Sequence, residues 1–346
     1  PIYFIEKQLS LSIDPLIDIS DVDRGSLAGA TITIAGFVPG QDFLSYSLQP
    51  GISASWNAST GGLTLTGIAP LSAYRLVLRS LAFANTSLAP IEGARVVTIA
   101  ITDGVAFSAP RSREIRVVAV NDPPRIQAPS DSVMFRENDA PTSLLPQVVI
   151  NDVDSPLLSG AIIRIARNYQ HGSDQLSFAP FGAIVGRWDS DIGALVLSGA
   201  ATASAYQAAL RSIMFVNTSE DPGTTIRTVE VAVFDESVQG LPLSINIAVE
   251  AVNDAPVISA APHMLRFTRA VAPTQLGAFM SFADPDSFLG AGGTIRVSHG
   301  WVSGADRLEF TPAQGVSVSF DPQSGTFTIQ GAISWSDLAD MFAQVT

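Results

Sequence analysis

The sequence predicts an all-β fold in which tandem Greek-key β-sandwiches follow one another along an elongated rod, each with one short helical turn. Short segments of alternating apolar and polar residues, bounded by Gly, Pro, Asn and Asp, indicate strands and turns. A set of motifs returns at a fixed interval along the chain, which is typical of repeat architectures. The 346 residues, 47% of them hydrophobic, suffice for two or three cores of ordinary size.

The internal repeat is clearest in the linker and helix motifs. The Asn-Asp-x-Pro motif that begins at Asn121 returns at Asn253, 132 positions later. A Tyr-x-x-x-Leu-Arg-Ser motif that begins at Tyr74 returns at Tyr206 with the same shift. The chain is therefore expected to hold three tandem units. Their expected ranges are 1–123, 124–255 and 256–346.

Each unit is expected to contain six or seven short strands, a number that suits a Greek-key sandwich. In the first unit, residues 30–35, 63–66 and 95–101 have the alternation of strands. Tyr206 and Leu210 of the second unit lie four positions apart, and the same spacing recurs in the other two units. This spacing predicts one or two helical turns that cap the edge of each sandwich.

The third unit is expected to be truncated before its last two strands. Thr346 aligns with Met214 of the second unit, where the alternating segments 228–234 and 243–252 follow and predict two more strands. A sandwich without them exposes an edge and an open core. We therefore expect that the sequence is an excerpt and that the natural chain continues. The alternative is that another chain donates the strands by β-augmentation.

Charge and residue usage exclude several classes of function. The chain has 32 Asp and Glu against 19 Lys and Arg, a net charge of −13, which argues against nucleic acid or an anionic membrane surface and favours cations. It has no cysteine and three histidines, so thiol chemistry is absent and histidine chemistry is nearly excluded. No apolar run approaches the ~20 residues that span a bilayer. Hydrolase and nucleotide-binding motifs are missing, and the carboxylates repeat with the units, so no enzyme activity is expected.

Carboxylates recur at fixed distances around each unit boundary. Asp122 is followed 30 residues later by the Asp-x-Asp motif that begins at Asp152, and Asp254 is followed at the same distance by the motif that begins at Asp284. If the strand after the linker runs along the next sandwich and its neighbour returns, these carboxylates meet at one junction. Carboxylates that meet repel each other unless a cation bridges them, and a loose site built from oxygen ligands suits Ca²⁺ better than Mg²⁺ or Zn²⁺. The alternative is ordinary turn and capping chemistry.

The order of Glu, Asp-x-Asp, a late Asp and Val-Asn-Asp-x-Pro resembles tandem cadherin-like repeats. With the Tyr-x-x-x-Leu-Arg-Ser and Phe-x-Asn-Thr-Ser elements, the chain is also similar to chondroitin sulfate proteoglycan repeats of large cell-surface proteins. The resemblance implies immunoglobulin/cadherin-like sandwiches with Ca²⁺ between them. The implied ligands are Glu6, Asn121 through its carbonyl, Asp122, Asp152 and Asp154 at the first junction, and Glu137, Asn253, Asp254, Asp284 and Asp286 at the second.

Departures from the family pattern reduce the expected number of ions. The acidic residue that cadherins place two positions before the linker Asn is replaced by Ala119 and Ala251, and no Asp-Arg-Glu motif occurs within a unit. About one ion per junction is therefore expected, where the family holds three. Arg269 stands at the Glu position of the third unit, which weakens any site beyond it. Weaker candidate ligands are Asp21, Asp23, Asp103 and Asp235.

Two further groups of polar residues have simpler expected roles. Asn57, Asn85 and Asn217 begin Asn-x-Ser sequences and are candidate N-glycosylation sites. Asp42 and Asp174 precede short apolar segments at equivalent positions and are expected to be turn residues.

The expected function is that of a calcium-stiffened structural or adhesive rod segment of a large extracellular or cell-surface protein. Its partners would be further repeats of the same chain, other copies, surface proteins or glycans. The alternative is a carbohydrate- or protein-binding module without interdomain calcium. Its aromatic candidate Trp301 aligns with Tyr169 and Phe37, and an aromatic kept in every unit favours packing over ligand binding.

Overall fold

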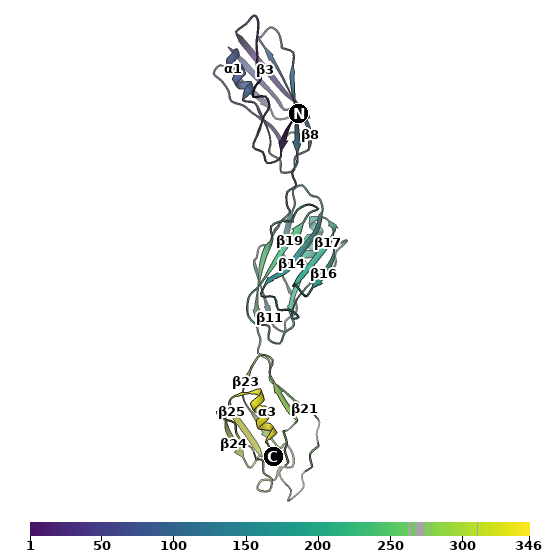
Figure 1. Cartoon of the computed structure of the whole chain (residues 1–346), viewed down its shortest axis with the longest axis vertical. Helices are drawn as coiled ribbons and strands as arrows, with labels where there is room; N and C mark the ends of the chain where they lie inside the picture. The colour runs from purple at the N-terminus through teal and green to yellow at the C-terminus, as the bar shows by residue number, and fades with distance from the viewer. Residues whose placement is uncertain (262–263, 267–273, 278, 310) are drawn as a thin grey trace.

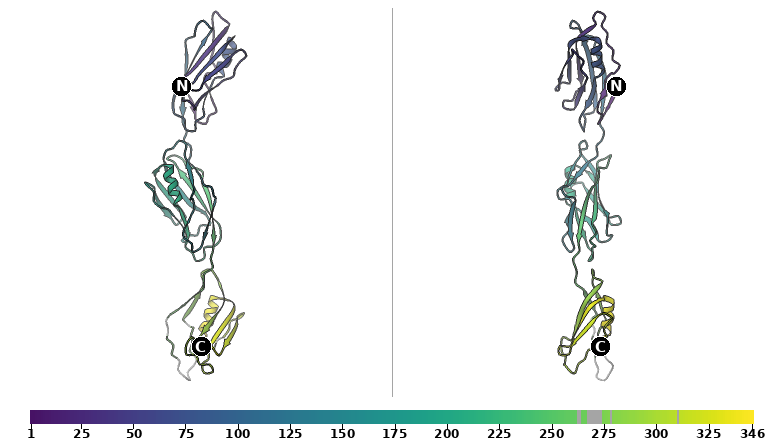
Figure 2. Two further views of the ribbon diagram at one scale, coloured as in Figure 1. Left: turned by 180° about the vertical axis from the view of Figure 1, so that it is seen from behind. Right: turned by 90° about the vertical axis from the view of Figure 1, so that its left-hand side faces the viewer.

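The computed structural model describes residues 1–261, 264–266, 274–277, 279–309 and 311–346, so Arg269 lies outside the described residues. Three β-rich bodies follow one another along one axis and are joined by thin linkers (Figure 1), and the two views in Figure 2 show the same arrangement. The predicted all-β sandwich-type fold is confirmed. In the following, the first, second and third repeats are the three predicted units. No described helix is long and apolar enough to cross a membrane.

The first repeat contains two sheets and one helix. Its elements are β1 (Ile2–Ile5), β2 (Leu11–Ser12), β3 (Ser26–Ala35), β4 (Asp42–Ser45), β5 (Ser53–Asn57), β6 (Gly62–Pro70), α1 (Leu71–Arg79), β7 (Ala82–Asn85), β8 (Gly93–Thr102) and β9 (Arg111–Val118). The larger sheet has the order β1-β9-β8-β3-β6-β5, and the smaller one has the order β2-β7-β4. Strand β1 pairs in parallel with β9, whereas the other pairings of the larger sheet are antiparallel.

The second repeat has the same two sheets and an additional strand pair at its start. Its elements are β10 (Arg125–Gln127), β11 (Ser132–Arg136), β12 (Thr142–Ser143), β13 (Val149–Asn151), β14 (Leu158–Arg167), β15 (Asp174–Ser177), β16 (Val185–Asp189), β17 (Ala194–Ala201), α2 (Ala203–Arg211), β18 (Met214–Asn217), β19 (Arg227–Phe234) and β20 (Leu243–Glu250). The sheets are β11-β20-β19-β14-β17-β16, β12-β18-β15 and β10-β13.

The third repeat, like the second, begins with a short strand that pairs with the strand before its Asp-x-Asp motif. Its described elements are β21 (Val257–Ala260), β22 (Met280–Ala283), β23 (Leu289–Arg296), β24 (Ser317–Asp321), β25 (Thr326–Ser334) and α3 (Trp335–Ala343). Strand β21 pairs with β22, and β23, β25 and β24 form a second sheet. Trp335, the one tryptophan without an aromatic equivalent, is packed inside the repeat, where its Nε1 donates a hydrogen bond of 2.6 Å to the Ser287 carbonyl.

The repeated tyrosine fixes α1 and α2 against their sheets. The Tyr206 hydroxyl donates a hydrogen bond of 2.8 Å to the Gly199 carbonyl, and Tyr74 makes the equivalent bond to Gly67 at 2.7 Å. Gly199 has φ 132°, and a Cβ on it would lie 2.4 Å from the Ala183 carbonyl oxygen, so only glycine fits. The recurrence of tyrosine and glycine therefore reflects packing within the first two repeats.

The cores of the first two repeats are built alike. Phe4 and Phe83 meet edge to face at 5.3 Å in the first repeat, and Phe135 and Phe215 do so at 5.4 Å in the second. All four side chains are buried. Because each pair joins the strand at the sheet edge to the smaller sheet, it holds the acidic residue that follows the edge strand in a fixed place.

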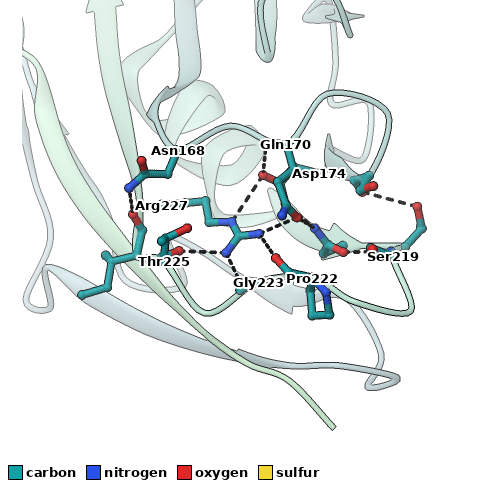
Figure 3. A network of polar contacts seen from close by, with 12 residues as sticks. Asn168, Gln170, Asp174, Ser219, Pro222, Gly223, Thr225 and Arg227 are labelled. Atoms are coloured by element: carbon teal, nitrogen blue, oxygen red, sulfur yellow. Dashed lines mark hydrogen bonds and ion pairs between the residues drawn. The ribbon is translucent and has the colours of Figure 1, made fainter. Parts of the chain in front are cut away.

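Asp42 and Asp174 do more than the turn role expected of them. Asp174 does accept a turn hydrogen bond from the Gln170 amide at 2.8 Å, but its side chain is also buried in an ion pair with Arg227. Figure 3 shows the Arg227 guanidinium enclosed by Asp174, Gln170 and the carbonyls of the loop before β19. Asp42 pairs with Arg95 at 2.8 Å in the first repeat. A buried charge needs such a partner, so the pair anchors the loop.

Two of the candidate glycosylation asparagines are structural. Asn85 and Asn217 are each only 6% exposed, and their Nδ2 atoms donate to Asp42 and Asp174 at 2.7 and 2.6 Å. Each Oδ1 accepts the amide of the Ser two positions later. A glycan on either nitrogen would displace a buried hydrogen bond, so these two asparagines do not suit glycan attachment in the folded chain. Asn57 is exposed at the end of β5.

Candidate cation sites between the repeats

Strand register brings the predicted carboxylates together. Strand β10 begins just after the first linker and pairs antiparallel with β13, with Arg125 opposite Asn151. Asp152 follows β13 directly, so it lies beside the linker that contains Asp122. Strands β21 and β22 repeat this arrangement, with Val257 opposite Ala283. At both junctions the strand after the linker therefore pairs with the strand that leads into the Asp-x-Asp motif, although at the first junction β11 and β12 intervene in the sequence.

At the first junction, the linker is bonded directly to the Asp-x-Asp motif. The Asp122 amide donates a hydrogen bond of 2.8 Å to Asp154 Oδ2. Asp152 Oδ1 accepts the amides of Asp154 and Ser155 at 3.3 and 2.9 Å, as in a turn. The other carboxylate oxygens, Asp152 Oδ2 and Asp154 Oδ1, are buried and have no hydrogen-bond partner among the described residues. Turn contacts therefore account for one oxygen of Asp152 and for neither oxygen of Asp154.

Glu6 approaches the same place from the end of β1. Its amide continues the parallel pairing by donating to the Val118 carbonyl at 3.0 Å, and its Oε2 accepts the Val120 amide at 2.9 Å. The residue is only 5% exposed, and Oε1 accepts no hydrogen bond in the described part of the chain. A buried carboxylate oxygen without a donor is costly unless a cation faces it.

The second junction repeats these contacts. Asp254 donates its amide to Asp286 Oδ2 at 2.9 Å, and Asp284 Oδ1 accepts the Ser287 amide at 3.1 Å. Glu137 Oε2 accepts the Val252 amide at 2.6 Å. The oxygens without a hydrogen-bond partner among described residues are Glu137 Oε1, Asp254 Oδ2 and Asp286 Oδ1.

Burial and neighbouring carboxyl groups shift the pKa values of the junction aspartates. Burial raises the pKa of Asp152, and the neighbouring charge of Asp154 adds to the rise, although two backbone amides oppose it. At the second junction, a hydrogen bond between the side chains of Asp284 and Asp286 raises the pKa of Asp284 and lowers the pKa of Asp286. These shifts arise mainly from burial at Asp152 and from the contact between the two carboxyl groups at Asp284 and Asp286.

The linker asparagines lie at the junctions but use their side chains for other contacts. Asn121 Nδ2 donates to Asp235 Oδ2 at 2.7 Å, and Ser155 Oγ donates to Asn121 Oδ1 at 3.1 Å. Asn253 Nδ2 donates to the carbonyl of the next residue, Asp254. The predicted ligand role of their backbone carbonyls stays a prediction.

The weaker candidate ligands of the first repeat are held by contacts within that repeat. Asp21 Oδ1 accepts the amides of Asp23 and Arg24 at 2.9 and 3.0 Å. Asp103 Oδ1 accepts the amides of Val105 and Ala106, as in a turn, and its Oδ2 pairs with Arg24 at 3.2 Å. An arginine thus neutralises Asp103 in this repeat.

Sequence reasoning missed two charged residues at the junctions. Glu220 lies with Glu137 and Asp254, and one carboxylate oxygen of each falls within 4.8 Å of the others. Lys7 Nζ lies 2.5 Å from Asp122 Oδ1 and 3.8 Å from Glu6 Oε1. The signal for Lys7 was its place directly after Glu6, and the signal for Glu220 was its place directly after the Asn-Thr-Ser element.

No protein family model matches the chain, and no curated protein matches it. The similar solved structures include mouse cadherin-23 EC22-24, with 13% identity over 96% of this chain and 85% of that chain and a TM-score of 0.30. They also include protocadherin gamma B2 extracellular cadherin domains 3-6, with 15% identity over 97% and 64% and a TM-score of 0.30. The Streptococcus agalactiae AgI/II polypeptide BspA C-terminal domain has 8% identity over 64% and 84% and a TM-score of 0.22. Similarities of this size carry no argument about function.

Proposed function

We propose that the chain is a segment of an adhesive or structural rod in an extracellular or cell-surface protein, and that Ca²⁺ bridging fixes the angle between neighbouring repeats. The observation that carries the proposal is the set of buried carboxylate oxygens without hydrogen-bond donors among the described residues, which lie at both junctions and include the equivalent pairs Glu6/Glu137 and Asp154/Asp286. Hard oxygen ligands with flexible spacing are the donors that Ca²⁺ prefers. At the second junction Glu137, Asp254 and Asp286 would hold the ion, and the first junction offers the equivalent Glu6, Asp122 and Asp154.

The proposed effect of Ca²⁺ is to stiffen the rod at the junctions between repeats. Extracellular modules bind Ca²⁺ with dissociation constants of roughly 10⁻⁴ to 10⁻³ M, so millimolar external Ca²⁺ fills such sites. At a few times the dissociation constant, one ion adds only about 1 kcal/mol to the free energy of unfolding. The same ion links side chains from two repeats, so it restricts their relative tilt far more than it stabilises either core.

Calcium titration and small-angle scattering of the whole chain test the proposal. Calorimetry should detect saturable Ca²⁺ binding, and the scattering-derived length distribution should narrow in 2 mM Ca²⁺ (about twice the upper limit of the expected dissociation constants) relative to EGTA. A matched variant is Glu137→Gln, which keeps the shape of the side chain and removes the charge. Absence of Ca²⁺ binding, or an identical length distribution in both conditions, would refute the proposal.

A further inference from the structure

The two junctions share one framework of contacts, which makes their differences informative. In both, a buried glutamate after the edge strand accepts the linker amide, and the linker aspartate donates to the second residue of the Asp-x-Asp motif. Glu6 and Glu137 are 5% and 2% exposed. Each keeps one buried oxygen without a hydrogen-bond donor among the described residues, aimed at the junction.

The first difference lies at the residue after this glutamate. Lys7 and Asn138 occupy equivalent positions and share the same left-handed backbone, each with φ 67°. That conformation turns the side chain of Lys7 back towards the linker, where its ammonium pairs with Asp122 at 2.5 Å and lies 3.8 Å from Glu6. The side chain of Asn138 is uncharged, so it cannot form an equivalent ion pair. Lys7 is the only lysine of the chain.

The second difference lies in the loop after the Asn-Thr-Ser element. Glu220 of the second repeat corresponds to Leu88 of the first. Its loop is fixed on both sides, because Ser219 donates its amide to Asn217 at 2.8 Å and the carbonyl of Pro222 accepts from the buried Arg227, as Figure 3 shows. Glu220 therefore lies at the second junction on a loop that is fixed on both sides.

These differences reverse the charge at the two positions compared. At the two positions, the first junction carries +1 from Lys7 and 0 from Leu88, whereas the second carries 0 from Asn138 and −1 from Glu220, a difference of two unit charges. A carboxylate oxygen of Glu220 lies within 4.8 Å of those of Glu137 and Asp254. Three carboxylates this close repel one another, and a cation from outside the chain would relieve the repulsion on the buried Glu137.

We propose that the ammonium of Lys7 is the bridging cation of the first junction, and that Ca²⁺ is required only at the second junction, where Glu220 is an additional ligand. The inference rests on the proposed function, because it assigns the ion of that function to one junction. A lysine ammonium can donate three hydrogen bonds to carboxylates and needs no free ion. The rod then has one junction that is rigid at any Ca²⁺ concentration and one that Ca²⁺ stiffens.

Exchange of the differing residues tests the proposal in calorimetric Ca²⁺ titrations of the whole chain. The unchanged chain should bind one Ca²⁺, and the double variant Lys7→Asn/Leu88→Glu should bind two. Asn138→Lys should weaken binding at least tenfold, and Glu220→Leu should weaken it several-fold. The matched control Ser244→Lys adds the same charge on the exposed face of β20 and should leave binding within twofold. Two equivalent ions in the unchanged chain, or no effect of Asn138→Lys, would overturn the proposal.

A second measurement needs no change at either junction. Ser53, Val185 and Ser317 are exposed and lie at equivalent places on the edge strands β5, β16 and β24. The chain has no cysteine, so Ser53→Cys/Val185→Cys and Val185→Cys/Ser317→Cys variants carry spin labels only across the first and second junctions.

Electron-spin distance distributions should broaden on addition of EGTA across the second junction and stay unchanged across the first. Equal broadening at both junctions would overturn the division of roles and leave the proposed function intact. Absence of any Ca²⁺ binding would overturn both.

Discussion

The side chain of Asn121 donates a hydrogen bond of 2.7 Å from Nδ2 to Oδ2 of Asp235, and this bond joins the linker to the loop after β19 of the second repeat. Asp235 is only 3% exposed, and its Oδ1 accepts the amides of Ser237 and Val238 at 2.6 and 2.8 Å. Burial alone would raise the pKa of Asp235, but these three donors together hold it below its usual value. The first junction is therefore also fixed by a bond that needs no cation.

Removal of this bond should loosen the first junction. We expect Asn121→Ala to broaden the spin-label distance distribution between positions 53 and 185, both in Ca²⁺ and in EGTA, because the backbone carbonyl of residue 121 is kept. The substitution also removes the hydrogen bond from Ser155 Oγ to Asn121 Oδ1, so the free energy of unfolding should fall by no more than about 3 kcal/mol, twice the upper value for one hydrogen bond. Asn253→Ala is the control, since among the described residues Asn253 Nδ2 donates only to the adjoining Asp254 carbonyl. An unchanged distribution between positions 53 and 185 would contradict the role of Asn121.

The buried ion pair of the second repeat should be costly to break. Asp174→Ala leaves the Arg227 guanidinium, 0% exposed, without its carboxylate and frees the Asn217 amide that Asp174 accepts. Removal of one partner of a buried pair costs about 3–5 kcal/mol. Urea unfolding of the whole chain should therefore show the transition of the second repeat shifted by that amount, with the first repeat unchanged. Asp42→Ala should instead shift the unfolding transition of the first repeat and leave the second unchanged. A loss of less than about 1 kcal/mol in the free energy of unfolding in both variants would show that the ion pairs are solvated.

The strands, helices and junction carboxylates could be predicted from the sequence because their signals are local or repeated. Tyr206 and Leu210 predicted α2, and the 30-residue spacing from Asp122 to Asp152 predicted the approach that the β10–β13 register produces. Comparison of equivalent positions in the three units was also informative. The position of Trp301 is aromatic in every unit, which indicated packing. Trp301 does pack, with its ring 6.1 Å from that of Phe320.

The missed residues depend on relations that spacing cannot show. Glu220 reaches Glu137 and Asp254 only because the loop before β19 folds back over the Arg227 guanidinium, a contact between distant parts of the repeat. Lys7 reaches Asp122 because its own φ is 67°, a backbone conformation that nothing in its residue type predicts. Asp174 looked like a turn residue because its acceptor role at Gln170 is local, whereas its partner Arg227 lies 53 positions away.

Burial should decide which asparagine can be glycosylated. When the chain is secreted from a host that modifies Asn-x-Ser sequences, we expect the folded fraction to carry glycan at Asn57 only, because Asn85 and Asn217 use their Nδ2 atoms in buried hydrogen bonds. Peptide mass spectrometry of the folded fraction measures the occupancy at each site. The control variant Asn57→Gln should remove the whole mass increment. Substantial occupancy at Asn217 in folded protein would contradict the burial argument.

A pH effect is expected at the turn between β24 and β25. Asp321 Oδ2 accepts the Ser324 hydroxyl at 2.6 Å and Oδ1 accepts the Gln323 amide at 3.0 Å, and these bonds lower the pKa of Asp321. Because the folded-state pKa lies below the unfolded value of about 3.9, the carboxylate stabilises the turn above that pH. Its contribution is lost as the pH falls through the folded-state pKa.

The first repeat supplies a matched variant for this effect. Asn57 takes the equivalent place and accepts the Ser59 amide and hydroxyl without titrating. Asp321→Asn should therefore keep the turn and remove its pH dependence. We expect the unfolding midpoint of the third repeat to be higher in the unchanged chain than in Asp321→Asn at pH 6, with the gap closing as the pH falls below the unfolded value of about 3.9 and through the folded-state pKa. A gap that stays constant from pH 6 to pH 2 would show that the Asp321 carboxylate does not stabilise the turn through its charge.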